Sequence, residues 1–166
     1  MVKIVITGPE STGKTSLAQQ LAHHYQTDWV KEYARIYIDQ LNRPYTREDL
    51  LSIAKGQLAS EEVAKMKGQH LVICDTSLEV IKIWSEVKYQ TCHPWILDRL
   101  QQQKVDLYLL CAPDISWQPD PLREHPEDRE WLFTIYQNEL KEKNFTEIWG
   151  EENERLHTAI RAIGSL

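Results

Sequence analysis

Residues 8–15 read Gly8-Pro9-Glu10-Ser11-Thr12-Gly13-Lys14-Thr15 and match the pattern G-x-x-x-x-G-K-[ST] at every position. An apolar run at residues 2–7 precedes them and predicts a buried strand, and apolar residues at helical spacing follow them. Gly8 and Gly13 allow backbone conformations that a side chain would obstruct, so consecutive N–H groups can turn inward onto an anion. We therefore predict that residues 8–15, here called the phosphate loop, bind the phosphates of a nucleotide.

Individual residues of the phosphate loop have separate expected roles. Lys14 can reach the β- and γ-phosphates, and the Thr15 hydroxyl is placed to bind the Mg²⁺ that accompanies them. The positive end of the following helix also favours phosphate at this position. The predicted nucleotide-binding residues are Gly8, Pro9, Glu10, Ser11, Thr12, Gly13, Lys14, Thr15 and Ser16.

Length and composition limit the class of protein. The chain has 166 residues, of which 42% are apolar and 27% are charged, and these values are ordinary for one globular domain. No signal peptide is recognisable and no apolar run approaches the roughly 18 residues of a membrane span, so we expect a cytoplasmic protein without a membrane partner. A net charge of −6 provides no general field to attract nucleic acid, and a small-molecule substrate is favoured.

Apolar runs and helical patterns alternate along the chain. Further strands are predicted at residues 28–33, 70–76, 105–111 and 145–149, with helices between them. This alternation is typical of a parallel sheet covered on both faces. We predict an α/β fold, a three-layer sandwich of the P-loop NTPase type with a five-stranded parallel sheet, formed by one domain over residues 1–166.

A segment at about residues 114–143 is expected to form a helical lid. It contains three prolines and charges of both signs, and a helix is predicted at 126–143. A lid excludes water, and a guanidinium stabilises charge on a transferring phosphoryl group. We predict Arg123 as the catalytic lid residue and Arg129 as a nucleotide-binding one. The alternative for both is a solvated charged loop.

Two predicted strands end in a carboxylate. Ligands of parallel α/β folds gather at the carboxyl ends of the strands, and phosphoryl transfer needs a group that orients the acceptor or takes its proton. Glu32 and Asp75 are therefore predicted to be catalytic, together with Lys14, and to contact the acceptor. Asp75 directly follows four apolar residues, and is predicted to hold Mg²⁺ together with Thr15. The alternatives are a helix cap for Asp75 and an ion pair with a neighbouring base for Glu32.

Two aromatic residues are candidate walls of the acceptor site. Trp84 lies about two turns into the helix after Asp75, and an aromatic face there would suit a flat ring, especially a cationic one. Trp84 also shares a helical face with Ile81 and Val87, which favours a core position equally. Tyr33 is a second candidate wall with the same two alternatives.

Several stretches together resemble one known family. They are the run Ile6-Thr7 with the phosphate loop, the run Val30-Lys31-Glu32-Tyr33-Ala34-Arg35, and the run Cys74-Asp75-Thr76 leading to Ile83-Trp84-Ser85-Glu86. They are similar to the ribosylnicotinamide kinase domain of NadR-type NAD-salvage proteins, which are AAA-like P-loop nucleoside kinases. The similarity extends over about residues 2–163, and residues 109–123 fit the entry to that family's lid.

The resemblance implies a reaction and a cofactor pair. It implies that ATP and Mg²⁺ serve the phosphorylation of the 5′-hydroxyl of nicotinamide riboside, which gives nicotinamide mononucleotide and ADP. NadR-type proteins carry a nucleotidyltransferase domain before the kinase, and this chain starts at the kinase's first strand, so a free-standing kinase without adenylyl transfer is expected. Two alternatives stay open, namely a kinase for another nucleoside or small alcohol, and a regulatory nucleotide-binding module.

Overall fold

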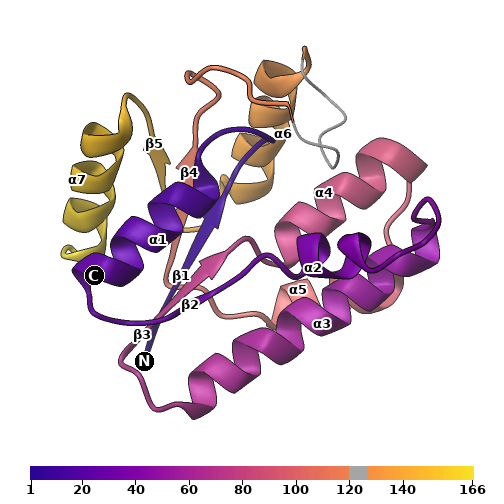
Figure 1. Ribbon diagram of the computed structural model, residues 1–166, viewed down its shortest axis with the longest axis horizontal. Coiled ribbons are helices and arrows are strands. Elements are labelled where there is room, and N and C mark those ends of the chain that lie inside the picture. The colour runs from indigo at the N-terminus through magenta and orange to yellow at the C-terminus, as the bar shows by residue number, and fades with distance from the viewer. Residues whose placement is uncertain (120–126) are drawn as a thin grey trace.

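The computed structural model describes residues 1–119 and 127–166, and a single parallel sheet forms its centre (Figure 1). The strand order is β2-β3-β1-β4-β5, and all four pairings are parallel. Ile4 in the middle of the sheet lies opposite Ile73 on one side and Leu107 on the other. The strands are β1 (Val2–Thr7), β2 (Trp29–Val30), β3 (Leu71–Asp75), β4 (Leu107–Cys111) and β5 (Phe145–Ile148).

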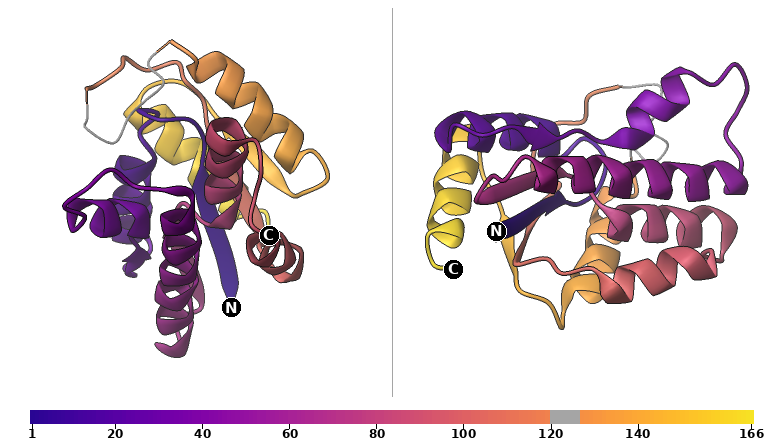
Figure 2. Two further views of the ribbon diagram at one scale, coloured as in Figure 1. Left: turned by 90° about the vertical axis from the view of Figure 1, so that its right-hand side faces the viewer. Right: turned by 90° about the horizontal axis from the view of Figure 1, so that it is seen from below.

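Helices cover both faces of this sheet (Figures 1 and 2). One face is covered by α1 and α7 and the other by α3, α4 and α6, while α2 packs on α3 and α5 on α4. The helices are α1 (Lys14–His24), α2 (Tyr33–Asp39), α3 (Arg47–Met66), α4 (Leu78–Tyr89), α5 (Pro94–Gln102), α6 (Arg129–Leu140) and α7 (Glu152–Ile163). Within the described ranges, none of these helices is long and apolar enough to cross a membrane. The predicted three-layer α/β fold is confirmed.

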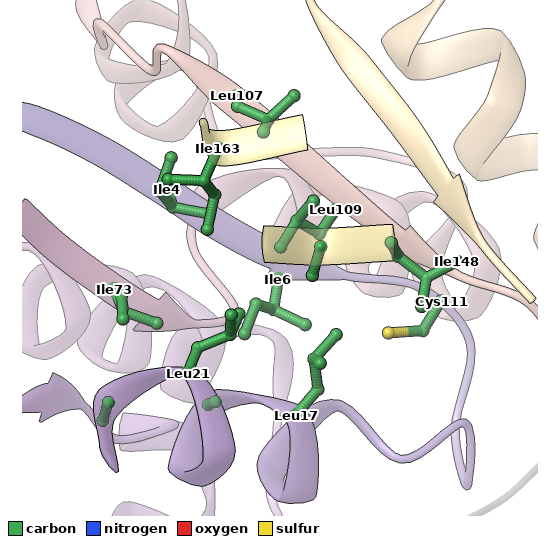
Figure 3. Packing of buried hydrophobic residues seen from close by; sticks show 13 residues of the cluster. Ile4, Ile6, Leu17, Leu21, Ile73, Leu107, Leu109, Cys111, Ile148 and Ile163 are labelled. Atoms are coloured by element: carbon green, nitrogen blue, oxygen red, sulfur yellow. The ribbon is translucent and has the colours of Figure 1, made fainter. Parts of the chain in front are cut away.

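The core lies on both sides of the sheet because successive strand residues point to opposite faces. Ile4 and Ile6 of β1 pack against α1 and α7, as Figure 3 shows for Leu17, Leu21 and Ile163. Val5, between them, belongs to a second cluster formed with α4 and α6. Both sets are almost fully buried, which explains why the strand reads as a continuous apolar run.

The predicted bounds of two strands are wrong. β2 covers only Trp29–Val30 and not residues 28–33, because it is an edge strand paired with β3 alone and the chain then turns into α2. The backbone N–H of Tyr33, the first residue of α2, donates to the side-chain oxygen of Gln57 at 2.9 Å. β4 begins two residues later than predicted, and the Asp106 carboxylate before it accepts the backbone N–H of Lys3 at 2.7 Å.

Candidate active site

The phosphate loop connects β1 to α1 at the carboxyl end of the sheet. Gly8 and Gly13 adopt φ angles of 132° and 76°, a region that favours glycine. A Cβ on Gly8 would come within 2.6 Å of the Cys111 carbonyl oxygen, so this position also needs glycine for its close approach to β4. The Thr12 hydroxyl donates to the Pro9 carbonyl oxygen at 2.8 Å and closes the loop on itself.

The ammonium and hydroxyl groups at the start of α1 each have a hydrogen-bond partner. The Lys14 ammonium donates to the Pro9 carbonyl oxygen at 2.6 Å. The Thr15 hydroxyl donates to Oδ2 of Asp75 at 2.6 Å, so the expected pairing of the phosphate loop with the end of β3 is present. Burial raises the pKa of Asp75, and the Thr15 hydroxyl and the positive charges of Lys14 and Arg35 act in the opposite direction.

Thr15 and Asp75 fit a magnesium ion. Mg²⁺ prefers hard oxygen ligands and is usually held by one or two protein oxygens, with water and substrate phosphates completing the shell. Oδ1 of Asp75 is buried and has no hydrogen-bond partner among the described residues, which leaves an anionic oxygen ready for a cation or its coordinated water. Among the described residues, no group of three or more His, Cys, Asp or Glu residues could hold a metal ion.

A pocket of about 500 Å³ extends from the phosphate loop across the carboxyl ends of the strands. Its lining includes all of the phosphate loop and Ser16, so every predicted nucleotide-binding residue except Arg129 borders it. Beyond the loop the apolar walls come mainly from α2, α4 and α6, with Ile38, Val80 and Tyr136 among their residues, and α7 contributes Glu152 and Arg155. One cavity thus joins a polar, phosphate-binding half to a largely apolar half.

The two predicted carboxylates take different positions around this pocket. Glu32 lies directly before α2 and lines the pocket together with Arg35. Asp75 is only 2% exposed and does not line the pocket; it lies beneath the floor, joined through Thr15. Glu32 thus borders the pocket and Asp75 reaches it only through Thr15, and their roles toward an acceptor or a metal stay predictions.

The two predicted aromatic walls are also separated. Trp84 lines the apolar half of the pocket, and its indole N–H donates to the Tyr45 hydroxyl at 3.0 Å. The Tyr45 and Trp84 rings meet edge to face with centroids 4.9 Å apart, which fixes the indole from behind. Tyr33 does not line the pocket. Its ring lies over Gly56 of α3, where an added Cβ would come within 2.0 Å of a ring carbon.

Only one of the two arginines that were predicted to belong to a lid lies within the described residues. Arg123 lies outside the described residues. Arg129 begins α6, later than the predicted start at residue 126, and its guanidinium donates to the carbonyl oxygens of Ser11 at 3.0 Å and Ile115 at 2.9 Å. The guanidinium also lies 5.7 Å from the ring centroid of Trp117. Arg129 therefore contacts the phosphate loop through a loop carbonyl.

Sequence reasoning missed Arg155 of α7, which lines the same pocket and is 4% exposed. It donates hydrogen bonds to the carbonyl oxygens of Thr12, Ala112 and Gly150. A signal existed in the sequence, because Arg155 falls four residues before Ala159 on the face of α7 that packs into the core. An arginine on such a face needs partners, and buried guanidinium groups are usually paired.

The family model described as "AAA domain" matches residues 3–155. The chain belongs to this family. Two curated relatives of this AAA domain are the trifunctional NAD biosynthesis/regulator proteins NadR of Escherichia coli (strain K12) and Salmonella typhimurium (strain LT2). Each is 24% identical, over 96% and 85% of this chain and over 40% and 36% of their own lengths. The AAA domain thus spans about two fifths of the relatives it matches, and the predicted resemblance to NadR-type proteins is confirmed.

Solved structures show the same fold. A NadR protein in complex with NR has a TM-score of 0.83 at 24% identity, covering 99% of this AAA domain and 51% of that chain. A deoxyadenosine kinase from M. mycoides has a TM-score of 0.63 at 14% identity, covering 99% of this chain and all of that one. This chain therefore shares its fold with the NadR protein and with the deoxyadenosine kinase.

Proposed function

We propose that this chain is a kinase that transfers the γ-phosphoryl group of ATP to the 5′-hydroxyl of nicotinamide riboside, giving nicotinamide mononucleotide. The observation that carries the proposal is the single pocket in which the phosphate loop, Glu32 and Trp84 meet. NadR proteins have been solved with NR and, separately, with NAD and AMP-PNP, which supports the same acceptor and donor for this chain.

The donor half of the pocket is assigned to the triphosphate. The inward N–H groups of the phosphate loop bind phosphate oxygens, and Lys14 exchanges its bond to the Pro9 carbonyl for the β- and γ-phosphates. Thr15 and Asp75 would hold magnesium, which when bound neutralises charge on the β- and γ-phosphates. Arg129, already attached to the Ser11 carbonyl, adds positive charge beside the loop, and Arg123 stays our candidate for the transferring group.

The acceptor half is assigned to the nucleoside. Glu32 orients the 5′-hydroxyl and accepts its proton as the oxygen attacks the γ-phosphorus, and the electron pair of the broken P–O bond leaves with ADP. The nicotinamide ring of the substrate is flat and positively charged, so the face of Trp84 suits it through its π electrons. The apolar residues around Trp84 limit the water that can compete as an acceptor.

The test measures ADP release from MgATP in four samples, which contain nicotinamide riboside, adenosine, deoxyadenosine or buffer alone. We expect nicotinamide riboside to give the largest stimulation. Stimulation by another nucleoside instead would support kinase activity but contradict nicotinamide riboside as the acceptor. Equal ADP release in every sample would favour a regulatory nucleotide-binding module and reject the kinase.

A further inference from the structure

Arg155 joins three segments that are far apart in the sequence. Its Nε donates to the Gly150 carbonyl oxygen at 2.6 Å, one terminal nitrogen donates to the Thr12 carbonyl oxygen at 2.8 Å, and the other donates to the Ala112 carbonyl oxygen at 3.0 Å. The last nitrogen also pairs with the carboxylate of Asp114. One side chain of α7 thereby holds the phosphate loop, the exit of β4 and the exit of β5 together.

The bond to Thr12 fixes a peptide of the phosphate loop. A trans peptide points its C=O and the following N–H in opposite directions. Because Arg155 holds the Thr12 carbonyl, the Gly13 N–H of the same peptide points away from this guanidinium, and in a phosphate loop such N–H groups turn toward the anion. Arg129 holds the preceding carbonyl, that of Ser11, and so directs the Thr12 N–H in the same way. Two consecutive N–H donors of the phosphate loop are therefore oriented by arginines that hold the carbonyl groups of the same peptides.

The contribution of Arg155 is geometric. Its charge is balanced by Asp114, whose second oxygen accepts the Gly150 N–H at 2.6 Å. The planar guanidinium places three donors toward three fixed carbonyl oxygens, which a lysine ammonium on a flexible stem does not reproduce. The Arg155–Asp114 ion pair therefore adds little net attraction for phosphate. Arg155 favours phosphate binding through the orientation of the Gly13 N–H group.

We propose that Arg155 is a positioning residue for nucleotide phosphates, acting through the Thr12–Gly13 peptide. The proposal rests on the proposed function only in that the chain binds a nucleotide, and it does not depend on which acceptor is phosphorylated. An N–H group that no longer faces the phosphate costs the bound nucleotide one charge-assisted hydrogen bond.

The experiment compares the binding of MgADP and of adenosine by calorimetry, using the whole chain. Arg155→Gln is expected to weaken MgADP binding by about 10- to 100-fold, the range for one hydrogen bond to a charged group. Adenosine, which has no phosphates, should bind with unchanged affinity. Arg155→Lys should lose less MgADP affinity than Arg155→Gln, because an ammonium can still reach the Thr12 carbonyl oxygen although it cannot bond all three carbonyl oxygens.

Two controls separate positioning from general destabilisation. Arg161→Gln makes the same substitution on the exposed side of α7, and Ile163→Ala destabilises the core end of that helix far from the phosphate loop. Both should bind MgADP as the wild type does at temperatures where they are folded. If Ile163→Ala weakens MgADP binding as much as Arg155→Gln, or if folded Arg155→Gln binds MgADP normally, the proposal is wrong.

Asp114→Asn covers the case in which the Arg155 variants do not fold. Asparagine has one oxygen where Asp114 uses two, so either Arg155 or the Gly150 N–H loses its acceptor. We expect a smaller loss of MgADP affinity in the same direction, and unchanged affinity would overturn the proposal. A wild-type protein that binds MgADP but phosphorylates no acceptor would reject the proposed function and leave this inference standing, whereas one that does not bind MgADP would reject both.

Discussion

Replacing Glu79 with glutamine is expected to stabilise the protein, and more strongly at neutral to alkaline pH than at acidic pH. Glu79 lies in the first turn of α4, its exposure is 0%, and neither carboxylate oxygen bonds to another described residue. The pKa of Glu79 is raised from 4.5 to about 7, chiefly by burial. Its own backbone N–H and the charges of Lys3 and Lys143 oppose the shift, and the charge of Glu61 adds to it. The ionised form is therefore disfavoured in the folded protein.

The sign and size of the effect follow from proton linkage. Between pH 4.5 and 7 the folded state holds the Glu79 proton while the unfolded chain has released it, so the free energy of unfolding falls as pH rises through this range. At about 1.4 kcal/mol per pKa unit the total loss is about 3 kcal/mol above pH 7. Glutamine resembles the protonated side chain and avoids this loss. Glu79→Gln should exceed the wild type by about 3 kcal/mol at pH 8 and by about 1 kcal/mol at pH 5.

The assay is urea denaturation of both proteins at pH 5, 6, 7 and 8, with the free energy of unfolding extrapolated to water. The tyrosines and the cysteine whose pKa values respond to the charge of Glu79 titrate above pH 8, so the difference between the two proteins over this range reports on Glu79. Glu48→Gln is a matched control in the first turn of α3, where the carboxylate is exposed. The pKa of Glu48 is lowered by its own backbone N–H and the Thr46 hydroxyl, so this variant should lose stability at high pH instead. The reasoning would be refuted if the free energy of unfolding of Glu79→Gln differed from that of the wild type by the same amount from pH 5 to pH 8.

Three further substitutions test the site. Glu32→Gln should lower kcat by about 10²- to 10⁴-fold with MgADP affinity unchanged, as expected for a lost proton acceptor, and near-normal turnover would remove Glu32 from the chemistry. Trp84→Leu keeps apolar volume but loses the π face and the hydrogen bond to Tyr45, so the KM for nicotinamide riboside should rise about 2- to 30-fold while the KM for ATP stays constant. A parallel rise in both KM values would place Trp84 outside the acceptor site. Gly8→Ala brings a methyl group against the Cys111 carbonyl at a φ of 132°, so thermal unfolding should show a loss of about 2 kcal/mol, whereas wild-type stability would mean that the loop adjusts.

The fold and the site could be predicted from the sequence wherever a local pattern of residues determines a local structure. The phosphate loop needs its two glycines and its neighbouring strand and helix, and all of these are consecutive. The position of Asp75 at the end of β3 follows from the four apolar residues before it, because a strand buried on both faces must be apolar throughout. The meeting of Thr15 with Asp75 then follows, because parallel strands bring their carboxyl ends to the same edge of the sheet.

Sequence reasoning failed where side chains meet through tertiary packing. Tyr33 follows Glu32 directly, yet the start of α2 turns its ring over Gly56, where the missing side chain leaves space. The partners of Arg155 are backbone carbonyls from three separate loops, and no spacing in the sequence identifies a carbonyl as an acceptor. Glu79 reads as a favourable acidic residue in a first helical turn, and only the packing of α4 shows that it is buried.

The central claim is that this phosphate loop serves phosphoryl transfer to nicotinamide riboside. The most direct measurement is mass spectrometry of nicotinamide riboside after incubation with MgATP and the protein, with Lys14→Ala as the inactive control. The account predicts nicotinamide mononucleotide with the wild type in amounts equal to the ADP formed, and none with the control. ADP formation by the wild type without nicotinamide mononucleotide would contradict the claim.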